Sequence, residues 1–282
     1  SCYTQSDMRP YKNFQKRFKL LIQKDKRFIE TTLSNIFTMR LVGNKTHGDL
    51  AEIGIAEFIN QYMYDFKSIH VGKDLYRAKK HEEDIVVINK LNGEKFPLSL
   101  KAYGDGPLQL STDKESRMFS YLEKISKKLI QDKKTIASIF NSENFIDFSS
   151  INVLPLIYNE KKKKCNIMIF DNEKAKQQTA KILKITKGKG RMHPAYIFQN
   201  EKDEYICEVR YGGKSANALQ RGLWTNTKRA VSFFDSLTNG WIEYKDNPSL
   251  VKLISIALNA TYVGHDKANE ILQKDIDNLK KI

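Results

Sequence analysis

The feature that most constrains the fold is a pair of short apolar runs in the first half of the chain. Residues 85–88 and 96–100 are separated by a polar segment that contains Asn92-Gly93. Two apolar, β-branched-rich runs on either side of Asn-Gly are typical of a β-hairpin. The sequence therefore predicts two antiparallel strands joined by a tight turn, and a sheet around which the rest of the chain is organised.

Charged residues stand at the two ends of this hairpin that meet in space. Asp84 precedes the first run and Lys101 follows the second. In an antiparallel pair the start of one strand lies beside the end of the next, so we expect these side chains at the same sheet edge. Carboxylates hold Mg²⁺, a hard cation that prefers oxygen ligands, and a nearby lysine can orient water or stabilise developing charge. The pair therefore indicates a metal-dependent phosphodiesterase site.

The overall charge and the cysteines narrow the partners and the compartment. Lys and Arg number 48 against 33 Asp and Glu, a net charge of +15. A polyanion such as nucleic acid is the first explanation, and a lysine-rich proteome of an AT-rich genome is the other. Cys2, Cys165 and Cys207 form neither a zinc spacing nor a disulfide framework, which fits a reducing cytoplasm. No apolar run approaches about 18 residues, so neither a membrane span nor a signal peptide is expected.

The remaining pattern predicts helices on both sides of the hairpin and further strands after it. We expect two amphipathic helices before residue 45, a helix over 50–64, a strand over 66–71, a helix after Asp113, strands over 151–158, 165–170 and 205–211, and a polar helix over 172–183. The fold class is α/β (α+β), with a mixed central sheet flanked by helices. Residues 1–150 would hold the N-terminal helices and the catalytic core with the metal site. Residues 151–282 would hold the remaining strands and the DNA-recognition region, within one continuous domain.

Three features together resemble the PD-(D/E)XK nuclease superfamily, most of all type II restriction endonucleases. Glu52 lies on a predicted helix, Asp84 opens a strand, and Ser99-Leu100-Lys101 closes the next strand. The resemblance covers about residues 46–120 and implies a restriction-endonuclease-like core, a Mg²⁺ cofactor and cleavage that leaves a 5′-phosphate and a 3′-hydroxyl. It implies Asp84 as a metal ligand and Lys101 as the residue that assists the attacking water. It also implies a homodimer and a cognate DNA methyltransferase in the same prokaryotic cytoplasm.

The chain departs from the superfamily pattern at two positions. Glu83 stands where the proline is usual, and Ser99 stands where the second acid is usual. A subgroup of restriction endonucleases resembles this pattern and takes the missing acid from the following helix. Glu115, which follows Lys101 by 14 residues, is the matching position. Asp113 is the neighbouring alternative, and Glu52 could fill the role without any relocation; Ser99 is then a supporting residue.

Residues 210–229 are the main candidate for reading DNA. Asn217, Gln220 and Arg221 are side-chain types that pair bidentately with base edges. Lys214, Thr225 and Lys228 suit phosphate contacts, and Lys189 and Arg191 form a glycine-interleaved basic loop that suits a backbone clamp. For Gln220 and Arg221 a capped surface helix without a reading role is an equal alternative.

A second acid-x-basic pattern, Asp203 with Glu208-Val209-Arg210, ranks below the first. The pKa of an arginine is too high for proton transfer.

These features predict a sequence-specific, Mg²⁺-dependent double-stranded DNA endonuclease of the type II restriction kind. One alternative is a repair or junction nuclease on the same core, which reads DNA shape. The other is a non-catalytic basic DNA-binding protein such as a repressor, for which Lys101 and Mg²⁺ would not matter. A helix-turn-helix pattern is lacking in the sequence, which counts modestly against a repressor.

Overall fold

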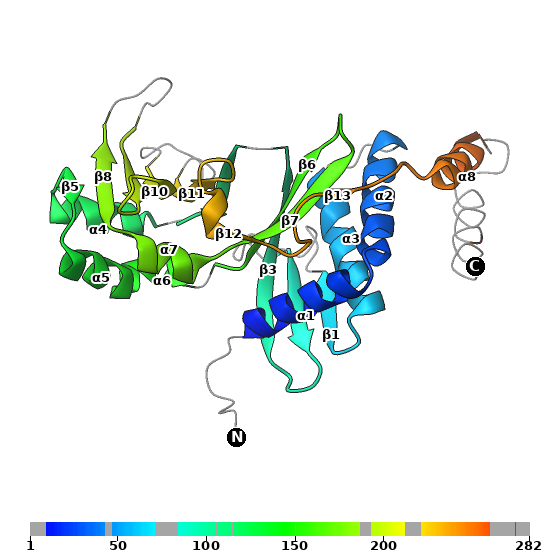
Figure 1. Cartoon of the computed structure of the whole chain (residues 1–282), viewed down its shortest axis with the longest axis horizontal. Helices are drawn as coiled ribbons and strands as arrows, with labels where there is room; N and C mark the ends of the chain where they lie inside the picture. Colours follow the sequence, from blue (N-terminus) through cyan, green and yellow to red (C-terminus); the bar gives the residue numbers. More distant parts are fainter. Residues whose placement is uncertain are drawn as a thin grey trace. The chain divides into compact units, whose positions relative to one another are not determined.

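The computed structural model describes residues 10–42, 47–70, 84–104, 106–113, 115–149, 151–186, 193–211, 221–259 and 274. It confirms an α+β fold with a mixed central sheet flanked by helices (Figure 1). The chain forms two compact units. Unit 1 comprises residues 1–103, 158–166 and 238–282, and unit 2 comprises residues 104–157 and 167–237. The division considered near residue 150 is therefore not where these boundaries fall.

The helices of unit 1 are α1 (Pro10–Lys24), α2 (Arg27–Val42), α3 (His47–Tyr62) and α8 (Pro248–Asn259). The first three confirm the helices predicted before the hairpin. In α1 the buried residues include Phe14, Phe18 and Leu21, which recur at helical spacing along one face. Pro10 begins α1, where its missing N–H is no loss.

The sheet of unit 1 begins with three antiparallel strands, β1 (Phe66–His70), β2 (Ile85–Asn89) and β3 (Lys95–Tyr103). The strand order continues through β6 (Val153–Asn159) and β7 (Lys164–Phe170), whose residues are divided between the two units, and β13 (Ile242–Glu243) pairs with the part of β7 that belongs to unit 1. The β2–β3 turn confirms the Asn-Gly prediction, because Gly93 has a φ of 76° and donates its N–H to the Asn89 carbonyl. A residue with a side chain is strained at that φ.

One face of this hairpin is packed against helices. Ile85, Val87, Leu98 and Leu100 are buried, whereas the residues between them are half-buried or exposed. α3 packs against β1 and β3, and Phe14 of α1 lies 5.5 Å and 5.6 Å, between ring centroids, from Phe66 and Phe96. Each aromatic pair of this kind contributes about 1 kcal/mol beyond its buried area. The alternation fixes which side chains of β2 and β3 face the helices.

Unit 2 is built on a six-stranded sheet whose order is β4, β11, β10, β9, β8, β5. These strands span Pro107–Ser111, Gly222–Asn226, Tyr205–Arg210, Ala195–Gln199, Lys181–Ile185 and Leu129–Ile130. The helices are α4 (Arg117–Ile125), α5 (Lys133–Asn141), α6 (Ile146–Ser149) and α7 (Asn172–Gln178), with the 3₁₀ turns η1 (Glu143–Phe145) and η3 (Val231–Phe233). A short strand, β12 (Phe234–Ser236), pairs with β7. The core includes Tyr196 and Phe198 under α4, α5 and η1.

The predicted helix over 172–183 was wrong in its second half. The helix ends at Gln178, and Lys181–Ile185 is strand β8. The hydroxyl of Thr179 donates to the Ala175 carbonyl at the helix end. Ile182 is fully buried and pairs with Phe198 on β9, so tertiary pairing overrides the polar, helix-like local sequence.

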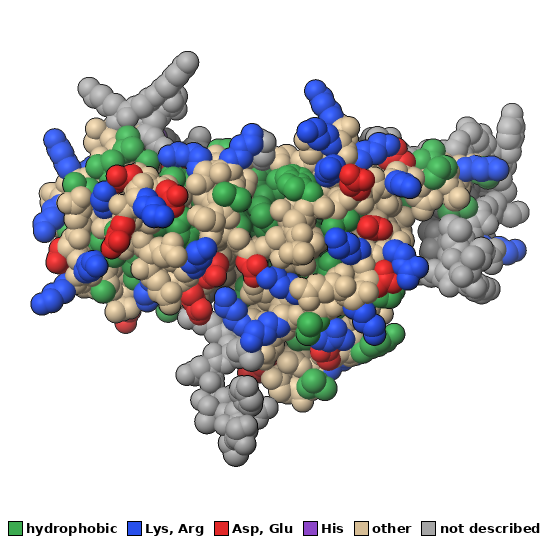
Figure 2. Space-filling model, viewed as in Figure 1, with side chains coloured by type: hydrophobic (Ala, Val, Ile, Leu, Met, Phe, Trp, Pro, Cys, Tyr) green, Lys and Arg blue, Asp and Glu red, His purple; other side chains and the backbone are tan. Residues whose placement is uncertain are grey.

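Within the part of the chain that the structure describes, no helix is both long and apolar enough to cross a membrane. Figure 2 shows Lys and Arg side chains scattered over the visible face, with acidic side chains among them.

Candidate active site

Asp84 immediately precedes β2 and the first described pair of the β2–β3 ladder. Ile85 pairs with Leu98 and Val86 pairs with Pro97. Because proline has no N–H, the hydrogen-bonded pair is Ile85–Leu98. The next N–H of β3 that points toward β2 belongs to Leu100, and it donates to Asp84 Oδ2 at 2.6 Å. This hydrogen bond fixes the carboxylate at the start of β2.

Ser99 and Lys101 lie beside this carboxylate. Continuing the register by one residue places Ser99 directly opposite Asp84. Ser99 and Lys101 are two residues apart and so face the same side of β3. Leu98 and Leu100 face the helices, so Ser99 and Lys101 face the other side, where both are half-buried. The structure therefore brings Asp84, Ser99 and Lys101 to one sheet edge, as the sequence predicted.

Glu52 reaches the same edge of unit 1 from α3. Its Oε2 lies 3.3 Å from Nε2 of His70, and only 13% of the Glu52 side chain is exposed. His70 ends β1 and is the partner of Ile85, the residue after Asp84. Since Ile85 faces the helices, the Glu52–His70 pair lies on the helix-covered side, and Ser99 and Lys101 lie on the other. His70 was not predicted as a site residue, although it lies near the end of the strand predicted over 66–71 and beside the predicted start of the hairpin.

The two acids proposed for the relocated carboxylate lie in unit 2. Glu115 is largely exposed, and its Oε2 lies 3.5 Å from Nε of Arg117. Its approach to Asp84 stays a prediction. Asp113 is buried and accepts the N–H groups of Arg117 and Met118, at 2.9 Å and 3.0 Å, which caps the start of α4. Burial raises the pKa of Asp113. Asp113 therefore has a structural role, and Glu115 is the acid of this pair that is accessible.

Some of the residues expected to contact DNA lie outside the described residues, and the others lie on or next to β11. Five of them lie outside the described residues: Lys189, Arg191, Lys214, Asn217 and Gln220. Lys228 is exposed after β11, as a phosphate contact requires. Arg221 is half-buried, and its carbonyl accepts a hydrogen bond from the Gln109 amide at 2.9 Å.

Thr225 does not suit the phosphate contact expected of it. It is fully buried on β11, and its hydroxyl donates to the Ile206 carbonyl at 2.7 Å. The alternation of β11 turns Thr225 toward the covered side of the sheet, together with the buried Leu223. Sequence reasoning missed this because the strand, and with it the facing of each residue, was not predicted there.

The second acid-x-basic pattern has its acids engaged elsewhere. Asp203 Oδ1 lies 2.5 Å from the Lys181 ammonium. Glu208 is buried on β10, and Arg210 Nε lies 2.5 Å from its Oε1. An internal ion pair of this kind satisfies a buried carboxylate. The low rank given to this pattern as a metal site agrees with the geometry.

Among the described residues, no group of three or more His, Cys, Asp and Glu is arranged to hold a metal ion. Among the described residues of the hairpin, the side-chain oxygen donors at this end are the Asp84 carboxylate and the Ser99 hydroxyl. This donor set fits a hard cation that keeps several waters and takes one or two carboxylates.

Comparison of the chain with models of protein families, with curated proteins and with solved structures found no match.

Proposed function

We propose that this protein is a Mg²⁺-dependent, sequence-specific endonuclease of double-stranded DNA, of the type II restriction kind. The observation that carries the proposal is the hydrogen bond from Leu100 N–H to Asp84 Oδ2 at 2.6 Å. It holds a carboxylate opposite Ser99 and next to the strand position of Lys101. A fixed carboxylate and a nearby amine on a basic protein suit hydrolysis of a phosphodiester.

Asp84 would hold Mg²⁺, and Glu115 is the accessible acid among those predicted to supply a second carboxylate. Glu52 is the weaker candidate, because it lies on the helix-covered side of the hairpin and contacts His70. The bound metal supplies Lewis-acid chemistry toward a phosphate and lowers the pKa of a coordinated water. The hydrogen bond from Leu100 orients the carboxylate of Asp84, so that little rearrangement is needed when a ligand binds. Ser99, opposite Asp84, would supply a hydroxyl rather than the usual second acid.

Lys101 would act on the water that attacks the phosphorus. Its ammonium group can donate a hydrogen bond that orients the water or stabilises charge on a phosphoryl oxygen. Lys101 and Ser99 face the same side of β3, away from α1 and α3. The attacking water and the scissile phosphate would therefore lie on that side of the hairpin.

The DNA partner is supported by the net charge of +15, which favours binding to a polyanion. Lys228 is exposed and suits a phosphate contact, as do the predicted contacts at residues 189, 191 and 214. A homodimer would suit cleavage of both strands of a two-fold site. A cytoplasmic location and a cognate methyltransferase are part of the same proposal, because both follow from the restriction role.

The test is incubation of unmethylated plasmid and phage DNA with the full chain, with Mg²⁺ and with EDTA. We expect discrete bands with Mg²⁺ and intact DNA with EDTA. Uncut DNA across several unmethylated substrates would contradict the proposal. Cleavage of branched junctions without fixed bands on plasmid would favour the structure-specific nuclease instead.

A further inference from the structure

Arg210, at the end of β10, is held in place from two directions. Its Nε donates to Glu208 Oε1 at 2.5 Å, and its Cζ lies 4.3 Å from the centroid of the Trp224 ring. Glu208 and Trp224 are directly opposite each other on β10 and β11. The three side chains share one face of the sheet, because alternate residues of a strand point the same way. The ring fixes the plane of the guanidinium, and the carboxylate fixes one edge.

The outer edge of this guanidinium has no protein partner among the described residues. Nε makes the one hydrogen bond of Arg210 within that part of the chain, and 29% of the side chain is exposed. The residue opposite Arg210 is Gly222, which is buried. Gly222 has a φ of 111°, and a Cβ there would collide with the Ser111 carbonyl. Within the described residues, the Nη groups are therefore positioned without a hydrogen-bond partner.

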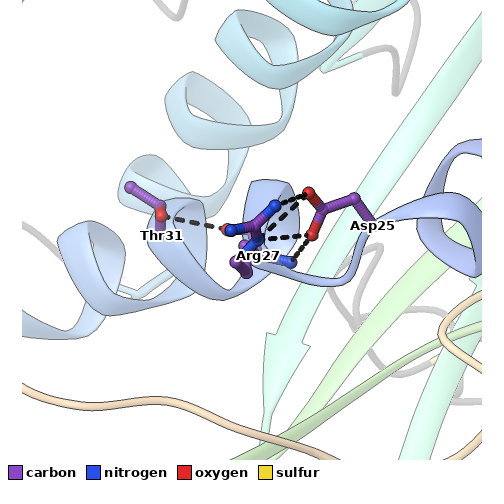
Figure 3. Close-up of polar contacts among 3 residues, drawn as sticks. All are labelled: Asp25, Arg27 and Thr31. Carbon is purple, nitrogen blue, oxygen red and sulfur yellow. Dashed lines mark hydrogen bonds and ion pairs between the residues drawn. The ribbon is translucent and has the colours of Figure 1, made fainter.

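Neutralising the buried carboxylate of Glu208 explains only part of the arrangement of Arg210. Glu208 is 3% exposed and requires a charged partner. Arg27 shows a different arrangement, in which two donor groups reach one carboxylate: Nε lies 3.0 Å and 3.1 Å from the two Asp25 oxygens, and Nη2 lies 2.6 Å from Oδ2 (Figure 3). Arg210 gives Glu208 its Nε alone, and its Nη groups have no hydrogen-bond partner among the described residues. This difference indicates a ligand for the Nη edge.

We infer that Arg210 contacts DNA through its Nη edge. A planar, pre-positioned pair of N–H donors matches two acceptors side by side, either two phosphate oxygens or O6 and N7 of a guanine. Holding the guanidinium before binding reduces the side-chain freedom lost on contact. The inference rests on the proposed function, which makes DNA the ligand, and it assigns that ligand to a residue of unit 2 outside the Asp84 site.

The experiment measures binding of a fluorescent duplex pool of random sequence by anisotropy, without Mg²⁺. Arg210→Lys keeps the charge but loses the planar fork. The double variant Arg210→Gln with Glu208→Gln removes both charges, so no buried charge is left unpaired. It therefore tests DNA binding even if the single variant has a lower melting temperature than the wild type. We expect both to weaken binding by about 10- to 100-fold. Arg27→Lys is the matched control, because Arg27 gives both Nε and Nη2 to Asp25; it should bind as the wild type does.

Two further measurements distinguish a phosphate contact of Arg210 from a guanine contact: the salt dependence of binding and the sequence preference of cleavage. Loss of a phosphate contact lowers the slope of log affinity against log salt by about one. Loss of a guanine contact leaves that slope unchanged and relaxes the cleavage preference at one position of the site. Either result supports the inference.

Variants of Arg210 that melt at the wild-type temperature and bind DNA as tightly as the wild type overturn it, while Mg²⁺-dependent cleavage by the wild type would still stand. A wild type that neither binds nor cuts duplex DNA overturns both this inference and the proposed function.

Discussion

The carboxylate of Asp84 accepts the backbone N–H of Leu100 at 2.6 Å. This hydrogen bond ties the side chain that precedes β2 to the backbone of β3. The strand ends that meet there carry Ser99 and Lys101. This arrangement is the structural basis for placing a hydrolytic site at the open end of the hairpin.

Replacement of Lys101 by Met should abolish most cleavage and leave DNA binding almost intact. The substitution keeps the length of the side chain but removes the ammonium group that assists the attacking water. A loss of about 100-fold or more in single-turnover rate is expected. The rate is measured with saturating enzyme on an end-labelled fragment.

Lys67→Met is the control for that experiment, because Lys67 is an exposed lysine on the neighbouring strand β1. Its cleavage rate should match that of the wild type. Equal rates for the Lys101 and Lys67 variants would remove Lys101 from the mechanism.

Replacement of Asp113 should destabilise unit 2 through α4. The Asp113 carboxylate accepts two N–H groups at the start of that helix, so Asp113→Ala should cost about 1 kcal/mol, within the 0.5–2 kcal/mol typical of lost caps. Asp113→Asn keeps one acceptor and suits the positive φ of 41°. Thermal melts at neutral pH should rank wild type above Asn and Asn above Ala.

The same variants carry a pH signature. Burial raises the pKa of Asp113, so the folded state holds this proton more tightly than the unfolded state does. The contribution of the group to stability therefore falls as pH rises from the ordinary aspartate pKa, about 3.9, through the folded pKa. The advantage of the wild type over Asp113→Asn should narrow across that window. An advantage that widens with pH would contradict the assigned direction.

Asn60 should protect the outer edge of β1. Ser68 N–H donates to Asn60 Oδ1 at 2.8 Å, and Asn60 Nδ2 donates to the Ser68 carbonyl at 3.3 Å. β1 ends the strand order, and the carboxamide occupies the positions where another strand would bond. Asn60→Leu should therefore self-associate more strongly with concentration, which light scattering detects.

Gln61→Leu, one residue further along α3 and also exposed, adds the same apolar side chain without uncovering Ser68. It should keep the wild-type mass. If the two variants associate equally, added apolar surface rather than the uncovered strand edge is responsible.

Local patterns were sufficient to predict the hairpin and that Asp84 and Lys101 stand at the same end of it. The Asn92-Gly93 turn fixes the register, and antiparallel pairing then fixes which strand ends are neighbours. The fold class and the first three helices follow from apolar periodicity in the same way.

Contacts between distant segments were not predictable from such patterns. The placement of Glu115 in unit 2 depends on how the chain passes between the units. The Glu52–His70 contact depends on the packing of α3. Whether Glu208 is buried, and so pairs with Arg210, depends on its neighbours in the sheet. These contacts are set by tertiary packing, which residue propensity and sequence spacing do not predict.

The most direct test of the central claim is the Mg²⁺-dependent cleavage rate of Asp84→Asn. Asparagine retains an oxygen that can accept the Leu100 N–H, so the variant should fold and bind DNA as the wild type does, while losing the charge that holds the metal. Asp25→Asn, in the α1–α2 corner shown in Figure 3, is the matched control. We predict a rate at least about 100-fold below the wild type for Asp84→Asn and an unchanged rate for Asp25→Asn. Wild-type cleavage by a folded Asp84→Asn protein would contradict the account.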